Sequence, residues 1–102
     1  MNKTCEVYDL IMITKRNNKQ FLNAKYKIIE TFNKINKCTY IVHNLQLNFV
    51  NGILVFEDRD DLILKNRSAL MGLLIDDINT ININEHMIDI FLFDNTRIAI
   101  EY

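Results

Sequence analysis

The chain has 102 residues and a formal net charge of −1 at pH 7, with 49% hydrophobic and 25% charged residues. A chain of this length can bury one hydrophobic core without a metal or a disulfide framework, so we expect a single domain spanning residues 1–102. The near-zero net charge excludes a general polyanion binder, and the complete lack of proline argues against a flexible linker.

The N-terminal region combines a short polar start with a mostly apolar run. Residues 5–14 are apolar on both faces after Asp9, which is typical of a buried strand, with a short helix as the alternative. The start lacks the pattern of a signal peptide, and the apolar runs are too short to span a membrane, so we expect a cytoplasmic protein. In that compartment Cys5 and Cys38 are expected to be buried and reduced.

Residues 18–37 have apolar side chains at the three- and four-residue spacing of an amphipathic helix. Asn17 or Asn18 is expected to act as the N-cap of this helix, because asparagine accepts hydrogen bonds from the first free N–H groups. The residues of this helix expected to face the core are Phe21, Ile28, Phe32 and Ile35.

From Thr39 onward apolar and polar residues alternate, as in strands with one buried face. Asn51-Gly52 lies between two alternating runs and predicts a tight hairpin turn, because both residues adopt positive φ at low cost. Residues 68–72 are expected to form one helical turn ended by Gly72, and Asp94-Asn95-Thr96 a turn between strands. The remaining strands are expected near residues 62–64, 74–83, 87–93 and 97–102.

These elements predict an α+β fold: an antiparallel sheet of five or six strands with one amphipathic helix packed on one face. The helix is expected to be the one at residues 18–37. The sheet residues expected to pack against it are Leu47, Phe49, Ile81, Ile83, Ile90 and Leu92.

The sequence has no recognisable catalytic, metal-binding or phosphate-binding motif. Ser68 and the cysteines lie in no activating motif, and His43 and His86 are single and far apart. Two glycines are too few for a phosphate-binding loop. We therefore expect no enzyme activity, no cofactor, no metal and no small-molecule substrate.

Charge is distributed unevenly along the chain. Residues 15–37 hold seven bases and one acid, whereas residues 57–102 hold ten acids and four bases. The basic residues are expected on the surface of the 18–37 helix, whose aromatic residues are used in the core, so nucleic acid is not the favoured partner. The acidic residues suit a basic protein such as a nuclease, where carboxylates would replace nucleic acid phosphates. The residues expected to contact this partner are Glu57, Asp58, Asp60, Asp61, Asp76 and Asp77.

Residues 68–102 resemble small immunity proteins of bacterial polymorphic toxin and contact-dependent growth inhibition systems. The resemblance rests on a short turn with Gly72, an Ile-rich strand, an acidic break and the closing hairpin Leu92–Ile100, in which Thr96 replaces the usual glycine. It implies a non-enzymatic protein that binds and neutralises one cognate toxin domain, and it carries over no binding residue. The alternatives are a phage-borne inhibitor of a host defence nuclease and a nucleic-acid-binding module using the 18–37 helix.

Overall fold

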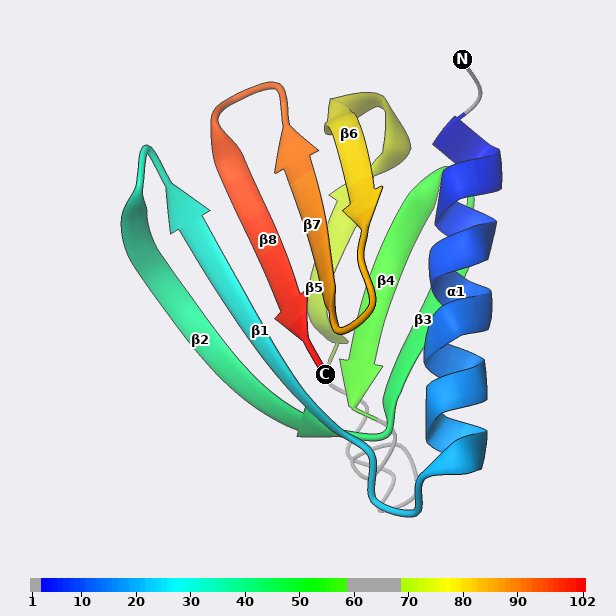
Figure 1. Ribbon diagram of the computed structural model, residues 1–102. Helices are drawn as coiled ribbons and strands as arrows, with labels where there is room; N and C mark the ends of the chain where they lie inside the picture. The colour runs from blue at the N-terminus through cyan, green and yellow to red at the C-terminus, as the bar shows by residue number, and fades with distance from the viewer. Residues whose placement is uncertain (1–2, 59–68) are drawn as a thin grey trace.

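The computed structural model describes residues 3–58 and 69–102, in which one long helix precedes eight strands (Figure 1). The elements in chain order are α1 (Lys3–Gln20), β1 (Lys25–Phe32), β2 (Ile35–His43), β3 (Leu45–Val50), β4 (Ile53–Asp58), β5 (Ala69–Leu74), the short 3-10 helix η1 (Ile75–Asp77), β6 (Ile78–Ile83), β7 (Met87–Leu92) and β8 (Thr96–Glu101). None of the described helices is both long enough and apolar enough to cross a membrane.

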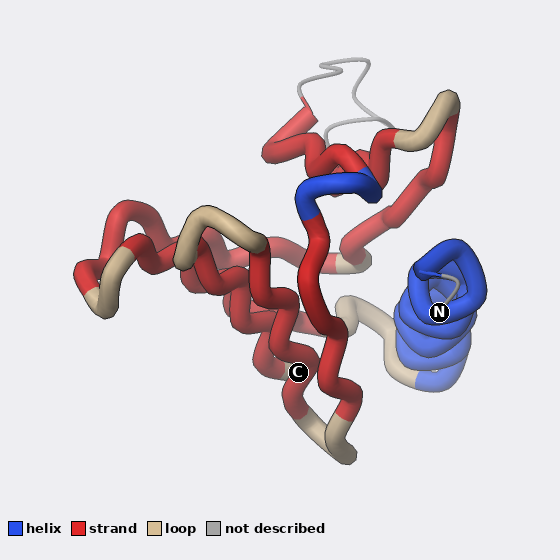
Figure 2. The backbone as a smooth tube through the Cα atoms, turned by 90° about the horizontal axis from the view of Figure 1, so that it is seen from above, coloured by secondary structure: helices blue, strands red, loops and turns tan. Residues whose placement is uncertain are grey.

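The strands form two antiparallel sheets. The larger has the order β2-β1-β8-β7-β6 and the smaller the order β3-β4-β5. Seen from above, the sheets lie at an angle with α1 at one side, and α1 packs mainly on β3 and also touches β6 (Figure 2). The predicted α+β class and the antiparallel sheet with a packed helix are confirmed, while the second sheet was not predicted.

The core fills the space between the two sheets and α1. Its completely buried residues include Ile88, Ile98 and Ile100 from the large sheet, Phe56 from the small sheet and Leu10 from α1. Among the predicted core residues, Ile28, Leu47 and Ile90 are buried, and Phe49, Ile81 and Leu92 are partly buried against the core. The prediction is wrong for four others, which are 38–69% exposed: Phe21, Phe32, Ile35 and Ile83.

The predicted helix at residues 18–37 is wrong, because most of this segment forms strands β1 and β2. Asn33 and Lys34 have φ values of 48° and 67°, which no right-handed helix allows, and they turn the chain between the two strands. Lys25 and Lys27 are exposed whereas Tyr26 and Ile28 are buried, which is the two-residue period of a strand.

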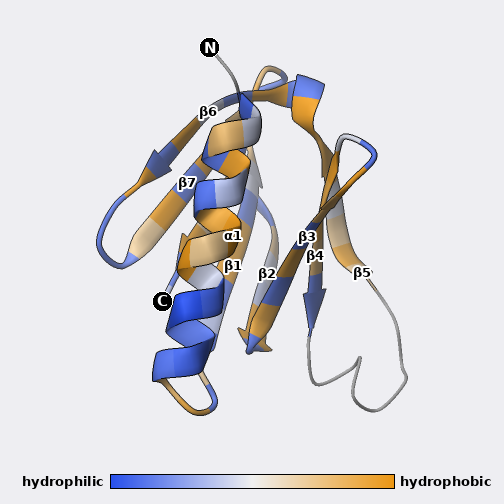
Figure 3. Ribbon diagram, turned by 90° about the vertical axis from the view of Figure 1, so that its right-hand side faces the viewer, coloured by the Kyte–Doolittle hydropathy of each residue, from blue (hydrophilic) through white to orange (hydrophobic). Residues whose placement is uncertain are grey.

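The helix of this fold begins at Lys3 instead. The expectation of a strand at residues 5–14 is wrong, and the helical alternative is correct. Its buried residues are Val7, Leu10, Ile11 and Thr14, which are spaced as one face of a helix. Hydrophobic and hydrophilic residues alternate along the N-terminal part of α1, and its C-terminal end is hydrophilic (Figure 3).

Two predicted turns are confirmed. Asn51 and Gly52 join β3 to β4 with φ values of 52° and 78°. In the turn between β7 and β8, the Thr96 N–H donates to Asp94 Oδ1 at 2.9 Å and Asn95 has a φ of 73°. Asp94 and Asn95 are therefore fully accounted for as turn residues.

The remaining predictions between β4 and β7 have mixed outcomes. Gly72 lies inside β5, paired with Val55, so the helical turn expected to end at Gly72 is wrong. Residues 62–64 and Ser68 lie outside the described residues. The expected strand at 74–83 begins only at Ile78, because η1 occupies residues 75–77.

One buried polar group joins α1 to the sheets. The Tyr26 hydroxyl donates to Asn18 Oδ1 at 2.6 Å and accepts from Asn17 Nδ2 at 3.0 Å. Asn18 Nδ2 donates in turn to the Leu45 carbonyl at 2.8 Å. Burial raises the pKa of Tyr26 above its ordinary value. The last turns of α1 are thus fixed to β1 and β3 by hydrogen bonds as well as by apolar packing.

Candidate functional site

The predicted acidic residues do not gather in one place. Glu57 and Asp58 end β4, whereas Asp76 and Asp77 lie in η1, just beyond the end of β5. Because Ile53 at the start of β4 pairs with Leu74 at the end of β5, these two acidic pairs lie at opposite ends of the small sheet. At about 3.3 Å per residue, the length of β4 separates them by roughly 17 Å. Asp60 and Asp61 lie outside the described residues.

The two acidic pairs also differ in exposure. Glu57 and Asp58 are half-buried, and Glu57 Oε1 accepts a hydrogen bond from Asn48 Nδ2 at 3.3 Å. Asp76 and Asp77 are exposed. Of the four predicted partner-binding residues that the structure describes, Asp76 and Asp77 are therefore the more accessible to a partner.

Asp76 and Asp77 lie beside a third exposed carboxylate. The Phe93 N–H donates to the Asp77 carbonyl at 3.0 Å and so holds the turn between β7 and β8 against η1. Asp94 follows in that turn, and its hydrogen bonds from Thr96 lower the pKa of its carboxyl group. This end of the molecule is the upper end in Figure 1.

Two large apolar side chains are exposed among these carboxylates. Leu74, just before η1, is 52% exposed, and Phe93 is 67% exposed. We call these five residues the acidic turn surface: Leu74, Asp76, Asp77, Phe93 and Asp94. The backbone hydrogen bond between Phe93 and Asp77 brings together two segments that are distant in the sequence. The sequence alone therefore gave no indication that these residues form one surface.

The basic face expected on an 18–37 helix does not exist, because that helix does not exist. Lys15 and Lys19 lie on α1, Lys25 and Lys27 on β1, and Lys34 in the turn that joins β1 to β2. The bases are thus spread over several elements instead of forming one helical face.

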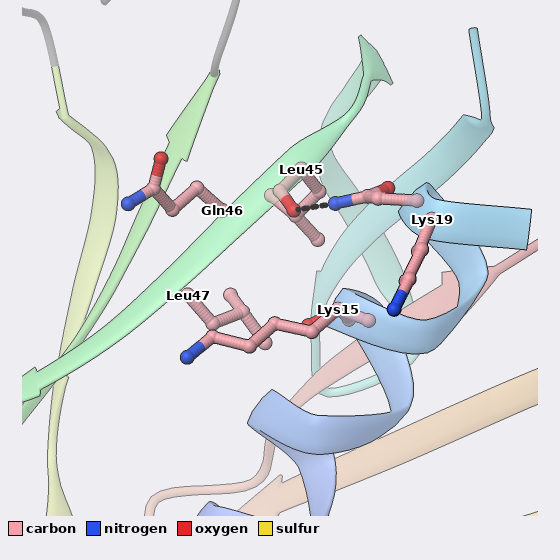
Figure 4. A pocket seen from close by; sticks show the side chains of 7 residues that line it. Lys15, Lys19, Leu45, Gln46 and Leu47 are labelled. Atoms are coloured by element: carbon pink, nitrogen blue, oxygen red, sulfur yellow. Dashed lines mark hydrogen bonds between the residues drawn. The ribbon is translucent and has the colours of Figure 1, made fainter. Parts of the chain in front are cut away.

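Lys15 and Lys19 border a cleft of about 430 Å³ between α1 and β3 (Figure 4). Asn18, between them, uses both its amide and its carbonyl group to join α1 to Leu45 and Tyr26. Both lysines are exposed and lie near the C-terminal end of α1, where positive charge suits the helix dipole. Asn18, which lines the cleft, therefore joins α1 to β3 through its hydrogen bond to Leu45.

The outer face of the large sheet carries a partly buried ion pair between Asp89 and Arg97 that the sequence reasoning missed. Ile88 and Ile90 of β7 point into the core, so Asp89 points to the other face of the sheet. Asp89 is only 9% exposed, and its Oδ1 accepts a hydrogen bond from Arg97 Nε at 2.9 Å. The Arg97 guanidinium also lies 5.9 Å from the centre of the Phe91 ring. The pairing of β7 with β8 places Asp89, Phe91 and Arg97 together. The sequence indicated this ion pair only through an aspartate between two isoleucines of a predicted strand.

At the turn end of this outer face lies a hollow of about 830 Å³. It is bordered by the β1–β2 turn, the β7–β8 hairpin and the start of β6. Its lining residues are Thr31, Asn33, Lys34, Asn79, Thr80, Phe91, Leu92, Asn95, Thr96 and Arg97.

The histidines and cysteines lie apart from both of these surfaces. His43 is exposed at the end of β2 and His86 in the turn between β6 and β7, where His86 Nε2 lies 3.7 Å from Glu85 Oε1. Cys5 is exposed and Cys38 half-buried, and both are free, so the expected burial of Cys5 is wrong. Within residues 3–58 and 69–102, no three His, Cys, Asp or Glu side chains are grouped as metal ligands.

Compared with models of known protein families, with curated protein sequences and with solved structures, the chain has no match.

Proposed function

We propose that this protein is a non-enzymatic inhibitor that neutralises a basic protein domain, of the toxin nuclease kind, by binding it through the acidic turn surface. The observation that carries the proposal is the grouping of Asp76, Asp77 and Asp94 with Leu74 and Phe93 at one exposed end of the fold. The resemblance of residues 68–102 to immunity proteins supports a toxin domain as the partner.

The chemistry of this surface suits such a partner. Specific protein interfaces have an apolar centre surrounded by polar and charged groups, and aromatic side chains often contribute most of the binding energy. Phe93 and Leu74 supply apolar groups, and three carboxylates supply negative charge that attracts a basic surface and speeds its encounter. Hydrogen bonds from Thr96 lower the pKa of the Asp94 carboxyl group and so favour its charged form.

The test is the affinity of the purified protein for a basic toxin nuclease domain, with the products of the neighbouring genes as the first candidates, measured by calorimetry at low and moderate salt. The double variant Asp76→Lys/Asp77→Lys should weaken binding by about tenfold or more, with a larger loss at low salt. Its matched control is Asp60→Lys/Asp61→Lys, which makes the same charge change in another predicted acidic pair, with melting temperature measured for both.

A selective loss in the 76/77 variant supports the proposed surface. A loss confined to the 60/61 variant would move the interface to residues 57–61 and contradict the role of the turns. If the wild-type protein neither binds the toxin domain nor blocks its nuclease activity, the inhibitor proposal itself fails.

A further inference from the structure

The hollow on the outer face of the large sheet is built from two turns that are fixed to each other. The Asn33 N–H donates to the Asn95 carbonyl at 3.3 Å and so joins the β1–β2 turn to the β7–β8 turn. Asn33, Lys34 and Asn95 all have positive φ values, between 48° and 73°. These defined conformations hold two amide side chains and one ammonium group at the rim of the hollow.

Irregular strand pairing occurs on both sides of the same hollow. On β6, Ile78 pairs with Leu92 and Thr80 with Phe91, which leaves Asn79 as the extra residue of a bulge. On the other side, the register between β1 and β2 shifts between Glu30 and Thr31. Bulges redirect side chains and are frequent beside binding sites. Asn79 and Thr31, which adjoin these two irregularities, both line the hollow.

Arg97 is held in place but keeps free hydrogen-bond donors. Its Nε and Nη2 atoms bond to Asp89 Oδ1, while Nη1 has no hydrogen-bond partner in the described part of the chain. Lys34 likewise makes no ion pair with any described residue. None of the described residues that line the hollow is acidic. An anion entering the hollow would therefore meet the Lys34 ammonium and the Nη1 of Arg97, whose other nitrogens bond to Asp89, and no acidic residue of the lining.

We propose that this hollow binds a nucleoside phosphate, either as a free nucleotide or as part of a single strand. The Arg97 guanidinium over Phe91 offers a plane on which a base can stack. Side-chain amides of Asn33, Asn79 and Asn95 can donate to and accept from a base edge, and Lys34 can bind phosphate. The volume of about 830 Å³ lies within the range typical of small-molecule sites. This site shares no lining residue with the acidic turn surface, although both adjoin the β7–β8 turn, and it does not depend on the proposed function.

Binding is tested by calorimetry with three probes: inorganic phosphate, AMP, and a single-stranded RNA octamer of mixed sequence. The main variant is Lys34→Asn/Asn79→Ala, in which asparagine tolerates the positive φ at residue 34. Phe91→Leu tests stacking separately. The control Lys15→Asn/Lys19→Asn removes two exposed charges from the cleft between α1 and β3. Melting temperature reports whether each variant remains folded.

AMP or the octamer should bind, and both the main variant and Phe91→Leu should weaken binding by about tenfold or more, because phosphate and stacking contacts each have that order of effect. Equal affinities for AMP and octamer identify a free nucleotide, and a stronger octamer identifies a nucleic acid strand. The proposal is overturned if neither binds, if inorganic phosphate binds as tightly as AMP, or if only the 15/19 control weakens binding.

Discussion

Replacing Tyr26 with phenylalanine removes one hydroxyl group from the junction between α1, β1 and β3. Tyr26 is completely buried, so the ring should stay in place and only the hydrogen bonds should be lost. The hydroxyl bonds to Asn18 at 2.6 Å and to Asn17 at 3.0 Å, and it also lies 3.3 Å from the Thr14 carbonyl as a second, longer acceptor. Tyr26→Phe therefore measures what this polar junction contributes to stability.

The expected loss follows from those two bonds. Each hydrogen bond contributes about 0.5–1.5 kcal/mol net, and water can reach the partly buried side chains of Asn17 and Asn18 once the hydroxyl is gone. We therefore expect the free energy of unfolding to fall by about 1–2 kcal/mol at pH 7, which for a domain of this size lowers the melting temperature by roughly 5–15 °C.

The pH dependence of stability gives a second signature. The pKa of Tyr26 is raised above its ordinary value of 10.0 in the folded protein, chiefly by burial. Its stabilising contribution is thus complete below about pH 10 and is lost as pH rises through the higher pKa of the folded state. Tyr26→Phe should remove part of the alkaline loss of stability, while Tyr102, whose pKa burial also raises, retains its share.

The assay is urea unfolding at pH 7 and at several pH values above 9. Tyr102→Phe is the matched control, because the Tyr102 hydroxyl makes no hydrogen bond with any described residue, and its loss should change stability by less than about 0.5 kcal/mol at pH 7. Equal effects of the two substitutions at pH 7 would refute the assignment of Tyr26 as the polar junction between α1 and the sheets.

The remaining predictions concern the helix and the thiols. Leu10→Ala should lower the free energy of unfolding by about 2–5 kcal/mol, whereas Phe32→Ala should cost much less, since Leu10 is completely buried and Phe32 is 38% exposed. The reverse order in chemical denaturation would favour a helix at residues 18–37. Cys5 should be alkylated rapidly in the native protein and Cys38 more slowly, and both should be modified after denaturation without reductant. Mass spectrometry that finds an internal disulfide would contradict this.

The turns between β3 and β4 and between β7 and β8 were predictable because local chemistry determines them. Asn51-Gly52 and Asp94-Asn95 favour turns wherever they occur between alternating apolar runs. Asparagine in fact performs this role throughout the fold. Within residues 3–58 and 69–102, the non-glycine residues with positive φ are Lys34 and five asparagines, namely Asn23, Asn33, Asn44, Asn51 and Asn95. This use of asparagine explains how a chain with two glycines makes so many tight turns.

The helix was misplaced because its sequence signals were ambiguous. Ile28, Phe32 and Ile35 have helical spacing, but Tyr26 and Ile28 also fit the two-residue period of a strand, and only pairing with β8 decides between them. Residues 5–14 form too short an apolar run for periodicity to distinguish a strand from a buried helix.

The candidate surfaces could not be predicted because they depend on tertiary contacts. Asp77 meets Phe93 through one backbone hydrogen bond, and Asp89 meets Arg97 through the pairing of β7 with β8. The distribution of charge along the sequence showed that the C-terminal half is negatively charged. It did not show at which ends of the sheets the carboxylates lie.

The most direct test of the proposed inhibitor function is amide hydrogen exchange of the protein alone and in complex with the toxin domain. The account predicts that binding protects residues 74–77 and 93–95 most strongly, because η1 and the β7–β8 turn carry the acidic turn surface. Protection confined to α1 or to residues 57–61, with no change at these two turns, would contradict it.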